Sequence, residues 1–431
     1  MKRIKTIASI LCLSALSMSA NDAYSYLSAP APKAYEYNDY YYQRSSHFAE
    51  LPIDGDDIIF LGNSLSDNGR WNEMFNNANV KNRGIISDVV QGVSDRVSVT
   101  LKGRPSKIFL LIGVNDVSHH IAPDSIAEAV EKLIVKIKTE SPETELYLQS
   151  WLPINNDFKR YKNMIGKEET ILKGNVYLEQ VARRQGVRWI NLFPAFAGED
   201  CKLYKHMTND GIHLNEAGYK VWRDEVAKYV APGQKITSEE LYPLGQNDII
   251  ILGNNLVGGA EWHEILDNPN VKSRNGWADV VDNLYLQARN VAKFKPAKIV
   301  LQSSYNSQDM PKGLNVNPNF NADSIVVSME KAILEIKNVS PETEILVQSL
   351  IPVNAEYEKY AEFAKTAKKV KAANKKLQKL AKKHNVVWVD VYPAMVDDKG
   401  NLKKEYTNDG FRLMGKGYTA WGEILKQYIN N

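Results

Sequence analysis

Residues 56–64 read Asp-Asp-Ile-Ile-Phe-Leu-Gly-Asn-Ser, and residues 247–255 read Asn-Asp-Ile-Ile-Ile-Leu-Gly-Asn-Asn. Each stretch is a short apolar run that ends in glycine, which is typical of a buried strand followed by a turn. A second pair reads Asn-Asp-Gly-Ile-His at 209–213 and Asn-Asp-Gly-Phe-Arg at 408–412. The sequence therefore contains one domain twice.

The two copies follow the same order and differ by one insertion. Their offset is 191 residues from Ser64 to Asn255, and 199 residues from Ser141 to Ser340, where both copies read Ser-Pro-Glu-Thr-Glu. The extra residues fall in the loop 308–321, which is rich in Asn, Pro and Gly. The loop follows a strand, where insertions that face a substrate are expected. This pattern indicates the duplication of one segment rather than two unrelated domains.

The first copy, expected at 51–230, alternates apolar strand-like runs with longer helix-like segments. We expect strands at 57–62, 80–83, 107–112, 145–150 and 187–191. We expect helices near 65–76, 88–100, 123–140, 167–185 and 215–230. Because strands joined by helical crossovers form parallel sheets covered on both faces, the predicted class is α/β, a three-layer α/β/α sandwich on a five-stranded parallel sheet, present twice. Sites in such sheets lie at the carboxyl ends of the strands.

The N-terminus has the pattern of a secretion signal. Basic residues at the start precede a short apolar run at 7–16 and then small residues, which predicts a signal peptide at 1–20. The run is too short to span a bilayer, and no other apolar run is long enough to do so. We therefore expect an exported protein, periplasmic or extracellular, without a membrane span. Lipidation at Cys12 is the minor alternative, because Leu11 stands where a lipoprotein signal has a small residue.

Length and composition describe a soluble globular protein of more than one domain. The chain has 431 residues, 44% of them hydrophobic and 24% charged, and its net charge of +3 implies no global attraction to nucleic acid or anionic membrane. Without the signal, Cys201 is the one remaining cysteine, which excludes an internal disulfide. Around the first copy we expect a lead-in at 21–50 that packs on it only near its end, a linker at 231–245, and the second copy at 246–431.

Three side chains of the first copy point to nucleophilic catalysis. Ser64 follows a strand at the start of a helix, which exposes its hydroxyl at the sheet edge, although a serine there is also typical of an N-cap. Asp210 and His213 favour catalysis, because a carboxylate can orient one ring nitrogen while the other takes a proton from the serine. Acyl transfer also needs oxyanion donors, and candidates are the backbone N–H of Gly84, the side chain of Asn115 and the N–H of the serine.

The segments that carry Ser64, Gly84, Asn115 and the Asp210–His213 pair, in this order, resemble the SGNH (GDSL-like) hydrolase family over residues 57–219. The resemblance implies ester hydrolysis through an acyl-enzyme, with these roles: Ser64 nucleophile, Gly84 and Asn115 oxyanion donors, His213 base and Asp210 its orienting acid. The family's Gly-Asp-Ser stands here as Gly-Asn-Ser, a change at a supporting position. No nucleotide-binding glycine loop and no zinc-ligand spacing occur, so no cofactor or metal is implied.

The second copy departs at the reacting positions. Asn255 replaces the serine and Arg412 the histidine, and neither an amide nor a guanidinium can take over those roles. The remaining positions are these: Ser304 replaces a glycine, Asn306 and Asp409 persist, and Gly84 aligns with Asn275 or Gly276. We expect no serine-hydrolase activity from this copy. Structural support, binding of a carbohydrate or ester through Arg412, and a new chemistry remain open as its role.

The substrate is expected to be an O-acylated glycan or another small ester, with no nucleic acid partner. The resemblance includes short-chain and sugar O-acetylesterases, and expected export favours a glycan O-acetylesterase. A lysophospholipase or short-chain lipid esterase, and a non-enzymatic glycan-binding protein, are the alternatives; the oligomeric state is left open. Softer candidates are the following: His119 and His120 at the cleft mouth, Trp71, Trp151 and Tyr204 for sugar stacking or packing, and the nine lysines of 365–383 as a solvated face or a surface for an anionic ligand.

Overall fold

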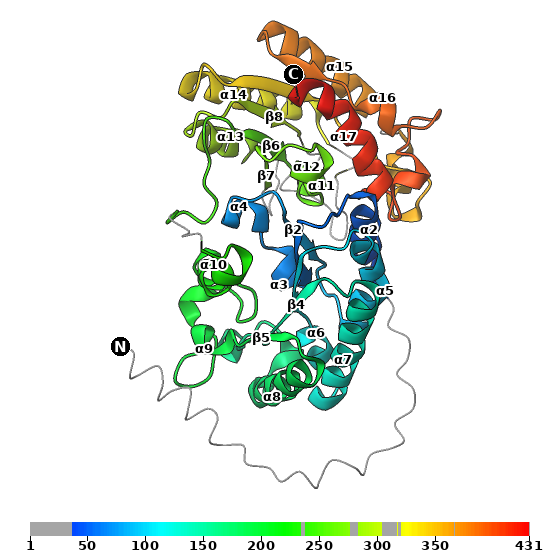
Figure 1. The fold of residues 1–431 in the computed structure, drawn as a ribbon. Coiled ribbons are helices and arrows are strands. Elements are labelled where there is room, and N and C mark those ends of the chain that lie inside the picture. The colour runs from blue at the N-terminus through cyan, green and yellow to red at the C-terminus, as the bar shows by residue number, and fades with distance from the viewer. Residues whose placement is uncertain are drawn as a thin grey trace. The chain divides into compact units, whose positions relative to one another are not determined.

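The computed structural model describes residues 37–233, 238–275, 283–303, 317, 320–365 and 367–430. Two compact units are formed (Figure 1): unit 1 contains Ile53–Tyr242 with the segment that precedes Asp39, and unit 2 contains Asp39–Pro52 and Pro243–Asn431. The expected signal peptide, most of the expected lead-in and most of the loop 308–321 lie outside the described residues.

Unit 1 alternates strands and helices along the chain. Its strands are β1 (Ile58–Gly62), β2 (Val80–Gly84), β3 (Lys107–Leu111), β4 (Glu145–Gln149) and β5 (Arg188–Ile190). Its α-helices are α3 (Ser64–Asp67), α4 (Trp71–Phe75), α5 (Val90–Leu101), α6 (Val114–Ser118), α7 (Pro123–Glu140), α8 (Glu168–Gln185), α9 (Phe193–Phe196) and α10 (Glu216–Val230). Short 3-10 turns are η1 (Asn156–Phe158), η2 (Lys162–Met164) and η3 (Lys205–Met207).

The five strands form one parallel sheet in the order β2-β1-β3-β4-β5. The central strand β1 pairs with both neighbours, Ile58 lying opposite Val80 on one side and Lys107 on the other. Because successive side chains of a strand point to opposite faces, an apolar run such as β1 must be covered on both sides. The sheet confirms the predicted α/β class.

Two separate cores lie on the two faces of this sheet. Ile59 and Leu61 pack with apolar side chains of α5, α7 and α8. Ile58 and Phe60 pack on the other face with α4 and α10. There the ring of Phe60 stacks on Trp71, with centroids 3.7 Å apart. The helices on either side make unit 1 the expected three-layer sandwich.

The helix expected near 65–76 is divided into α3 and α4. The indole Nε1 of Trp71 donates to the carbonyl of Ser66 at 2.8 Å, which folds the second helix back on the first. At Gly69, between them, a Cβ would lie 2.5 Å from this indole ring, so the turn requires glycine. The short helix α6 was not predicted.

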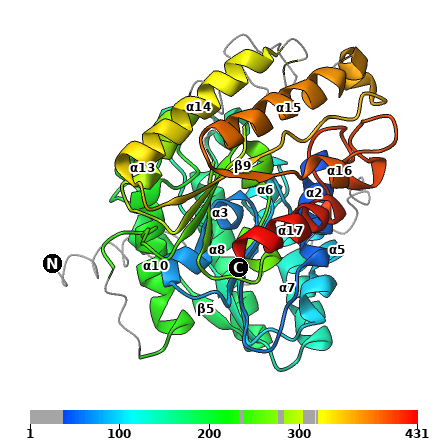
Figure 2. The same cartoon turned by 90° about the horizontal axis from the view of Figure 1, so that it is seen from above.

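Unit 2 repeats the architecture. Its strands are β6 (Ile249–Gly253), β7 (Val271–Asn275), β8 (Lys298–Leu301), β9 (Glu344–Gln348) and β10 (Val387–Val389), in the sheet order β7-β6-β8-β9-β10. Its helices are α2 (Asp39–Glu50), α11 (Asn255–Gly258), α12 (Trp262–Ile265), α13 (Leu284–Ala292), α14 (Ala322–Val339), η5 (Glu358–Lys365), α15 (Ala367–Lys383), α16 (Tyr392–Met395), η6 (Lys404–Tyr406) and α17 (Gly415–Ile429). Helices α14 and α15 run side by side (Figure 2).

Helix α2 precedes unit 1 in sequence but folds into unit 2. The guanidinium of Arg44, 3% exposed, contacts the carboxylate of Glu261 at 2.7 Å and donates to the carbonyl of Gly259 at 3.0 Å. The ring of His47 accepts the backbone N–H of Glu261 at 3.0 Å. The expectation that the lead-in packs on the first domain is therefore wrong for residues 39–50, because its buried polar side chains find their partners in unit 2.

The expected linker is partly absorbed into unit 1. Leu241 is buried in the core beside α4 and α10, and Tyr242 lies beneath the guanidinium of Arg70. Among the residues described, no helix is both long and apolar enough to cross a membrane.

Candidate active site

Ser64 stands where β1 ends and α3 begins, with its side chain largely buried. The cap of α3 is the preceding residue, because the side-chain oxygen of Asn63 accepts the backbone N–H of Leu65 at 3.0 Å. An N-cap side chain satisfies donors that the first turn leaves unpaired. Asn63 fills this role, so the interpretation of Ser64 as the N-cap is wrong and its hydroxyl remains available.

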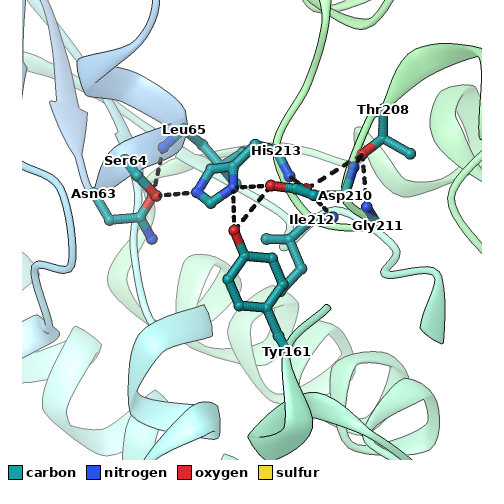
Figure 3. Close-up of polar contacts among 9 residues, drawn as sticks. All are labelled: Asn63, Ser64, Leu65, Tyr161, Thr208, Asp210, Gly211, Ile212 and His213. Carbon is teal, nitrogen blue, oxygen red and sulfur yellow. Dashed lines mark hydrogen bonds and ion pairs between the residues drawn. The ribbon is translucent and has the colours of Figure 1, made fainter. Parts of the chain in front are cut away.

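The hydroxyl of Ser64 lies in line with an imidazole and a carboxylate (Figure 3). The distance from Ser64 Oγ to His213 Nε2 is 3.0 Å. On the far side of the ring, Nδ1 lies 2.8 Å from Oδ2 of Asp210. Both distances are within hydrogen-bond range. The structure thus brings together three of the five predicted site residues, from the first strand and from the loop before α10.

The loop that carries Asp210 and His213 is held by its own backbone. Oδ1 of Asp210 accepts the N–H of Ile212 at 2.9 Å and of His213 at 2.8 Å. The hydroxyl of Thr208 accepts the N–H of Gly211 at 2.9 Å, and Gly211 has a φ of 91°, which favours glycine. The sequence Thr-Asn-Asp-Gly-Ile-His therefore leaves Oδ2 of the carboxylate facing the imidazole.

The carboxylate of Asp210 stays ionised at neutral pH. Burial raises its pKa, but the hydrogen bonds from His213 and from the backbone N–H of Ile212 outweigh burial and lower the pKa to about 2. A permanently charged carboxylate against Nδ1 fixes the tautomer of the ring and stabilises the imidazolium. It leaves Nε2 as the ring atom that can accept a proton from Ser64.

Tyr161 is a site residue that the sequence did not indicate. Its hydroxyl donates to Oδ2 of Asp210 at 2.9 Å and lies 3.2 Å from Nδ1 of His213 (Figure 3). The ring meets the imidazole edge-on, with centroids 5.8 Å apart. Burial and the neighbouring carboxylate raise the pKa of Tyr161 to about 12, which keeps its proton in place. It lies in the segment between β4 and α8, whose sequence carries no motif.

Gly84 does not offer a free N–H at the site. Its backbone N–H donates to the side-chain oxygen of Asn82 at 2.8 Å, which differs from the expected role as oxyanion donor. The glycine has a packing reason instead, because a Cβ would lie 2.1 Å from the backbone nitrogen of Asp67 in α3. In the turn that follows, Ser87 adopts a φ of 66°, uncommon for a residue with a side chain and often found at functional sites.

Asn115 is the half-buried second residue of α6, the helix that follows β3. Its amide nitrogen donates to the carbonyl of Asp88 at 2.8 Å, which ties it to the turn after β2. An amide carries two N–H groups, and within the described residues only this one has a partner. The preceding Gly113, with a φ of 121°, leaves room for the ring of Trp151, which a Cβ would approach to 2.6 Å. Asn115 therefore keeps one N–H for a ligand.

A buried ion pair holds these segments together. The guanidinium of Arg96 contacts Asp88 at 2.9 Å and donates to the carbonyl of Gly62 at 3.1 Å, linking the turn after β2 to the end of β1. Next to Asn115, Asp116 accepts the N–H of Val90 at 3.3 Å. Burial raises the pKa of Asp116 to about 7. None of these buried charges was predicted.

The aromatic and histidine candidates for substrate contact divide into buried and exposed residues. Trp71 and Trp151 are fully buried, so both serve packing, whereas Tyr204 is 39% exposed. His119 and His120 are exposed at the end of α6. In the part of the chain that the structure describes, no three His, Cys, Asp or Glu side chains gather as a metal site would require.

The equivalent position in unit 2 has the same loop with different side chains. Oδ1 of Asp409 accepts the N–H of Arg412 at 2.7 Å, as Asp210 does for His213, and the guanidinium of Arg412 contacts Oδ2 at 3.2 Å. Asn255 begins α11, again capped by the residue before it. Strand pairing places Asn275 opposite Gly253, as Gly84 is opposite Gly62, which decides the alignment for Asn275. Gly276, Ser304 and Asn306 lie outside the described residues.

A serine, an imidazole and a carboxylate in this order at the carboxyl ends of parallel strands define a site of the serine-hydrolase class. The profile of the GDSL-like Lipase/Acylhydrolase family matches residues 55–221 and 257–420, one stretch in each unit. The chain therefore belongs to the GDSL-like lipase/acylhydrolase family, and its class of activity is acyl ester hydrolysis. No curated protein matches the chain.

Similar solved structures each compare with about half of the chain. A candidate platelet activating factor from Streptococcus pneumoniae is 26% identical, with a TM-score of 0.41, covering 44% of this chain and 91% of that one. A GDSL-like lipase from Bacteroides thetaiotaomicron is 21% identical, with a TM-score of 0.36, covering 50% and 98%. An acetyl-xylooligosaccharide esterase from a species of Geobacillus is 16% identical, with a TM-score of 0.35, covering 44% and 99%.

Proposed function

We propose that unit 1 is an exported serine esterase that removes short acyl groups, foremost acetyl, from carbohydrates. The observation that carries the proposal is the line of hydrogen bonds from Ser64 through His213 to Asp210, with distances of 3.0 and 2.8 Å. Membership of an acylhydrolase family supports the same reaction class.

The geometry suits a two-step mechanism. Ser64 Oγ attacks the ester carbonyl while Nε2 of His213 takes its proton, and the resulting imidazolium is stabilised by the carboxylate of Asp210. The tetrahedral intermediate collapses to an acyl-enzyme, and the imidazolium gives its proton to the departing alcohol. Water then attacks the acyl-enzyme with the imidazole again as base, which releases the acid and restores the serine hydroxyl.

Two donors are available for the negative charge on the carbonyl oxygen. The N–H of Ser64 lies in the first turn of α3, where N–H groups lack intrahelical partners and the helix dipole favours negative charge. The second is the remaining amide N–H of Asn115. Gly84 supports this oxyanion site through close packing of β2 on α3.

Carbohydrate esters are the preferred substrates for two reasons. A protein exported by the signal peptide predicted at 1–20 would meet glycans outside the cytoplasm. Tyr204 exposes an aromatic ring in the segment beside η3, and exposed aromatic faces stack on sugars. A short-chain lipid esterase is the alternative, and acyl-chain preference separates them: a steep preference for acetyl over longer chains supports sugar deacetylation.

The test is hydrolysis of p-nitrophenyl acetate by the mature chain and by Ser64→Ala. Loss of a serine nucleophile lowers turnover by about 10,000-fold or more in serine hydrolases. The matched control is Ser66→Ala on the same helix, whose hydroxyl has no hydrogen-bond partner among the described residues and whose loss is expected to leave the rate unchanged. Equal rates for wild type and Ser64→Ala would refute the proposal and favour a non-enzymatic glycan-binding protein.

We also propose that unit 2 does not hydrolyse esters. The support is the amide of Asn255 at the nucleophile position and the Arg412–Asp409 contact at the base position. Because Ser64→Ala leaves unit 2 unchanged, any ester hydrolysis that survives in this variant and is lost on Arg412→Ala would contradict this assignment.

A further inference from the structure

Helix α15 of unit 2 has an unusual charge composition. Its sequence Ala-Lys-Lys-Val-Lys-Ala-Ala-Asn-Lys-Lys-Leu-Gln-Lys-Leu-Ala-Lys-Lys contains eight lysines and no acidic residue. The equivalent helix of unit 1, α8, contains three acidic and three basic residues. Both helices cover the same edge of equivalent sheets, so the fold does not require the basic charge. The charge belongs to the second copy alone.

One side of α15 is committed to the core. Val370, Ala373 and Leu377 are buried against the sheet of unit 2, whereas all eight lysines are exposed. Of the lysines, Lys376 contacts Asp323 at 2.5 Å and Lys383 contacts Glu330 at 2.7 Å. Both acids lie on α14, which runs alongside (Figure 2).

Of the six remaining lysines, five form a row on one exposed face of α15. Its five members, defined here as the lysine row, are Lys368, Lys371, Lys375, Lys379 and Lys382. Their spacing of three, four, four and three residues places them on one helix face over about 21 Å, at 1.5 Å per residue. Within the described residues, no acidic side chain pairs with any of them. Five like charges in a line repel one another, which disfavours the row unless a ligand of opposite charge uses it.

We propose that the lysine row binds an acidic polysaccharide, a linear chain that carries carboxylates. A line of flexible ammonium groups suits repeated charges along a polymer. The exposed face of α15 has no large apolar side chain that would enter a membrane, and no aromatic or arginine side chain on which nucleic acid bases would stack. The choice of a polysaccharide among polyanions rests on the proposed action on glycans. Unit 2 would then hold the polymer while unit 1 hydrolyses its esters.

The test measures binding of the full chain to polygalacturonate, with and without Lys→Gln at all five positions of the lysine row. We expect the variant to lose affinity by about tenfold or more at low salt, and wild-type affinity to fall as salt rises, because the contacts are electrostatic. A control variant removes five other exposed lysines spread over the surface and is expected to bind within about twofold of wild type. These control positions are Lys102, Lys132, Lys159, Lys228 and Lys416.

Melting temperature and p-nitrophenyl acetate hydrolysis are expected to be unchanged in the lysine-row variant, since its side chains are exposed and lie in unit 2. Equal binding by wild type and this variant, or an equal loss in the control variant, would overturn the proposal. Tighter binding to polyuridylate or to phosphatidylserine vesicles than to polygalacturonate would overturn the choice of ligand. Failure of the esterase proposal is detected separately, through Ser64→Ala, which leaves the lysine row intact.

Discussion

Replacing Tyr161 by phenylalanine tests how the Asp–His pair is tuned. The change removes one hydroxyl, which donates to Oδ2 of Asp210 at 2.9 Å and lies 3.2 Å from Nδ1 of His213. Among the described residues, Oδ2 of Asp210 has two donors, the hydroxyl of Tyr161 and Nδ1 of His213, whereas Oδ1 accepts backbone N–H groups. Without the tyrosine, more of the negative charge on Oδ2 faces the ring, and the protonated, inactive imidazolium is better stabilised.

The size of this effect follows from the lost hydrogen bond. A hydrogen bond to a charged group contributes about 1.5–3 kcal/mol, and we take about 1 kcal/mol because Oδ2 of Asp210 keeps its other donor. One pH unit corresponds to 1.36 kcal/mol, so the acid limb of the kcat/KM profile should move up by about 0.7 pH units. The plateau should fall by a few-fold, because the carboxylate loses one of its restraints.

The assay is the pH dependence of p-nitrophenyl acetate hydrolysis between about pH 5 and pH 9, with Tyr177→Phe as control. Tyr177 lies on α8 with 37% of its side chain exposed, so the loss of its hydroxyl should leave the profile unchanged. An acid limb that stays in place in Tyr161→Phe, or that moves to lower pH, would refute this reasoning, because a merely structural tyrosine would lower the plateau without moving the limb.

Three further variants test other parts of the structure. Gly84→Ala should destabilise unit 1 by about 3 kcal/mol, because the new Cβ would lie 2.1 Å from a backbone nitrogen of α3; a melting temperature equal to wild type would contradict this packing. Arg44→Ala should destabilise unit 2 by about 2 kcal/mol, because it leaves the largely buried carboxylate of Glu261 unpaired, and esterase activity should be retained. Denaturant unfolding and the rate of p-nitrophenyl acetate hydrolysis measure these two outcomes. An unchanged free energy of unfolding would contradict the packing of α2 in unit 2. Because burial raises the pKa of Asp116 to about 7, the free energy of unfolding should fall as the pH rises from about 4 to about 7. In Asp116→Asn, urea titrations should show a weaker dependence of this free energy on pH. An equal pH dependence in both proteins would exclude Asp116 as its cause.

The sequence predicted the sheet well, because each strand is an apolar run bounded by turn residues. β1 and β3 were placed within one residue of their observed ends, and α7 at its observed bounds. Ser64 and His213 were predicted together because Asp210 precedes His213 by three residues, as an orienting acid can, and because the motifs resemble a hydrolase family that uses this pair. These predictions depend on periodicity and chain order, which the sequence carries directly.

What the sequence could not predict depends on contacts between distant segments. Tyr161 reaches Asp210 only because the segment after β4 folds over the loop before α10. Helix α2 has no sequence mark of its partner, since Arg44 and Glu261 are far apart in the chain. The N–H of Gly84 was assigned to the oxyanion, but its direction is set by the neighbouring Asn82, and backbone direction is not readable from residue type.

Each unit contains an equivalent buried hydrogen bond between its last helix and its sheet. The indole of Trp222 donates to the side chain of Gln149 at 2.8 Å, and that of Trp421 to Gln348 at 2.7 Å. Because buried polar groups that lose a partner are costly, keeping both members of each pair preserves the packing of the last helix on the sheet. Unit 2 has therefore retained the internal bonds of the fold while the reacting side chains differ.

A compensating pair of substitutions between the units lies where the second strand packs on the helix after the first strand. In unit 1, Gly84 leaves room for the backbone of Asp67, whereas in unit 2 the side chain of Asn275 occupies that space and the opposing residue is Gly258, where a Cβ would lie 2.0 Å from the amide nitrogen. The larger side chain therefore lies on the helix in unit 1 and on the strand in unit 2, and glycine at the facing position keeps the two segments in close contact in both units. Such a paired change preserves the packing of β7 on α11, so the two units keep the same close approach with different side chains.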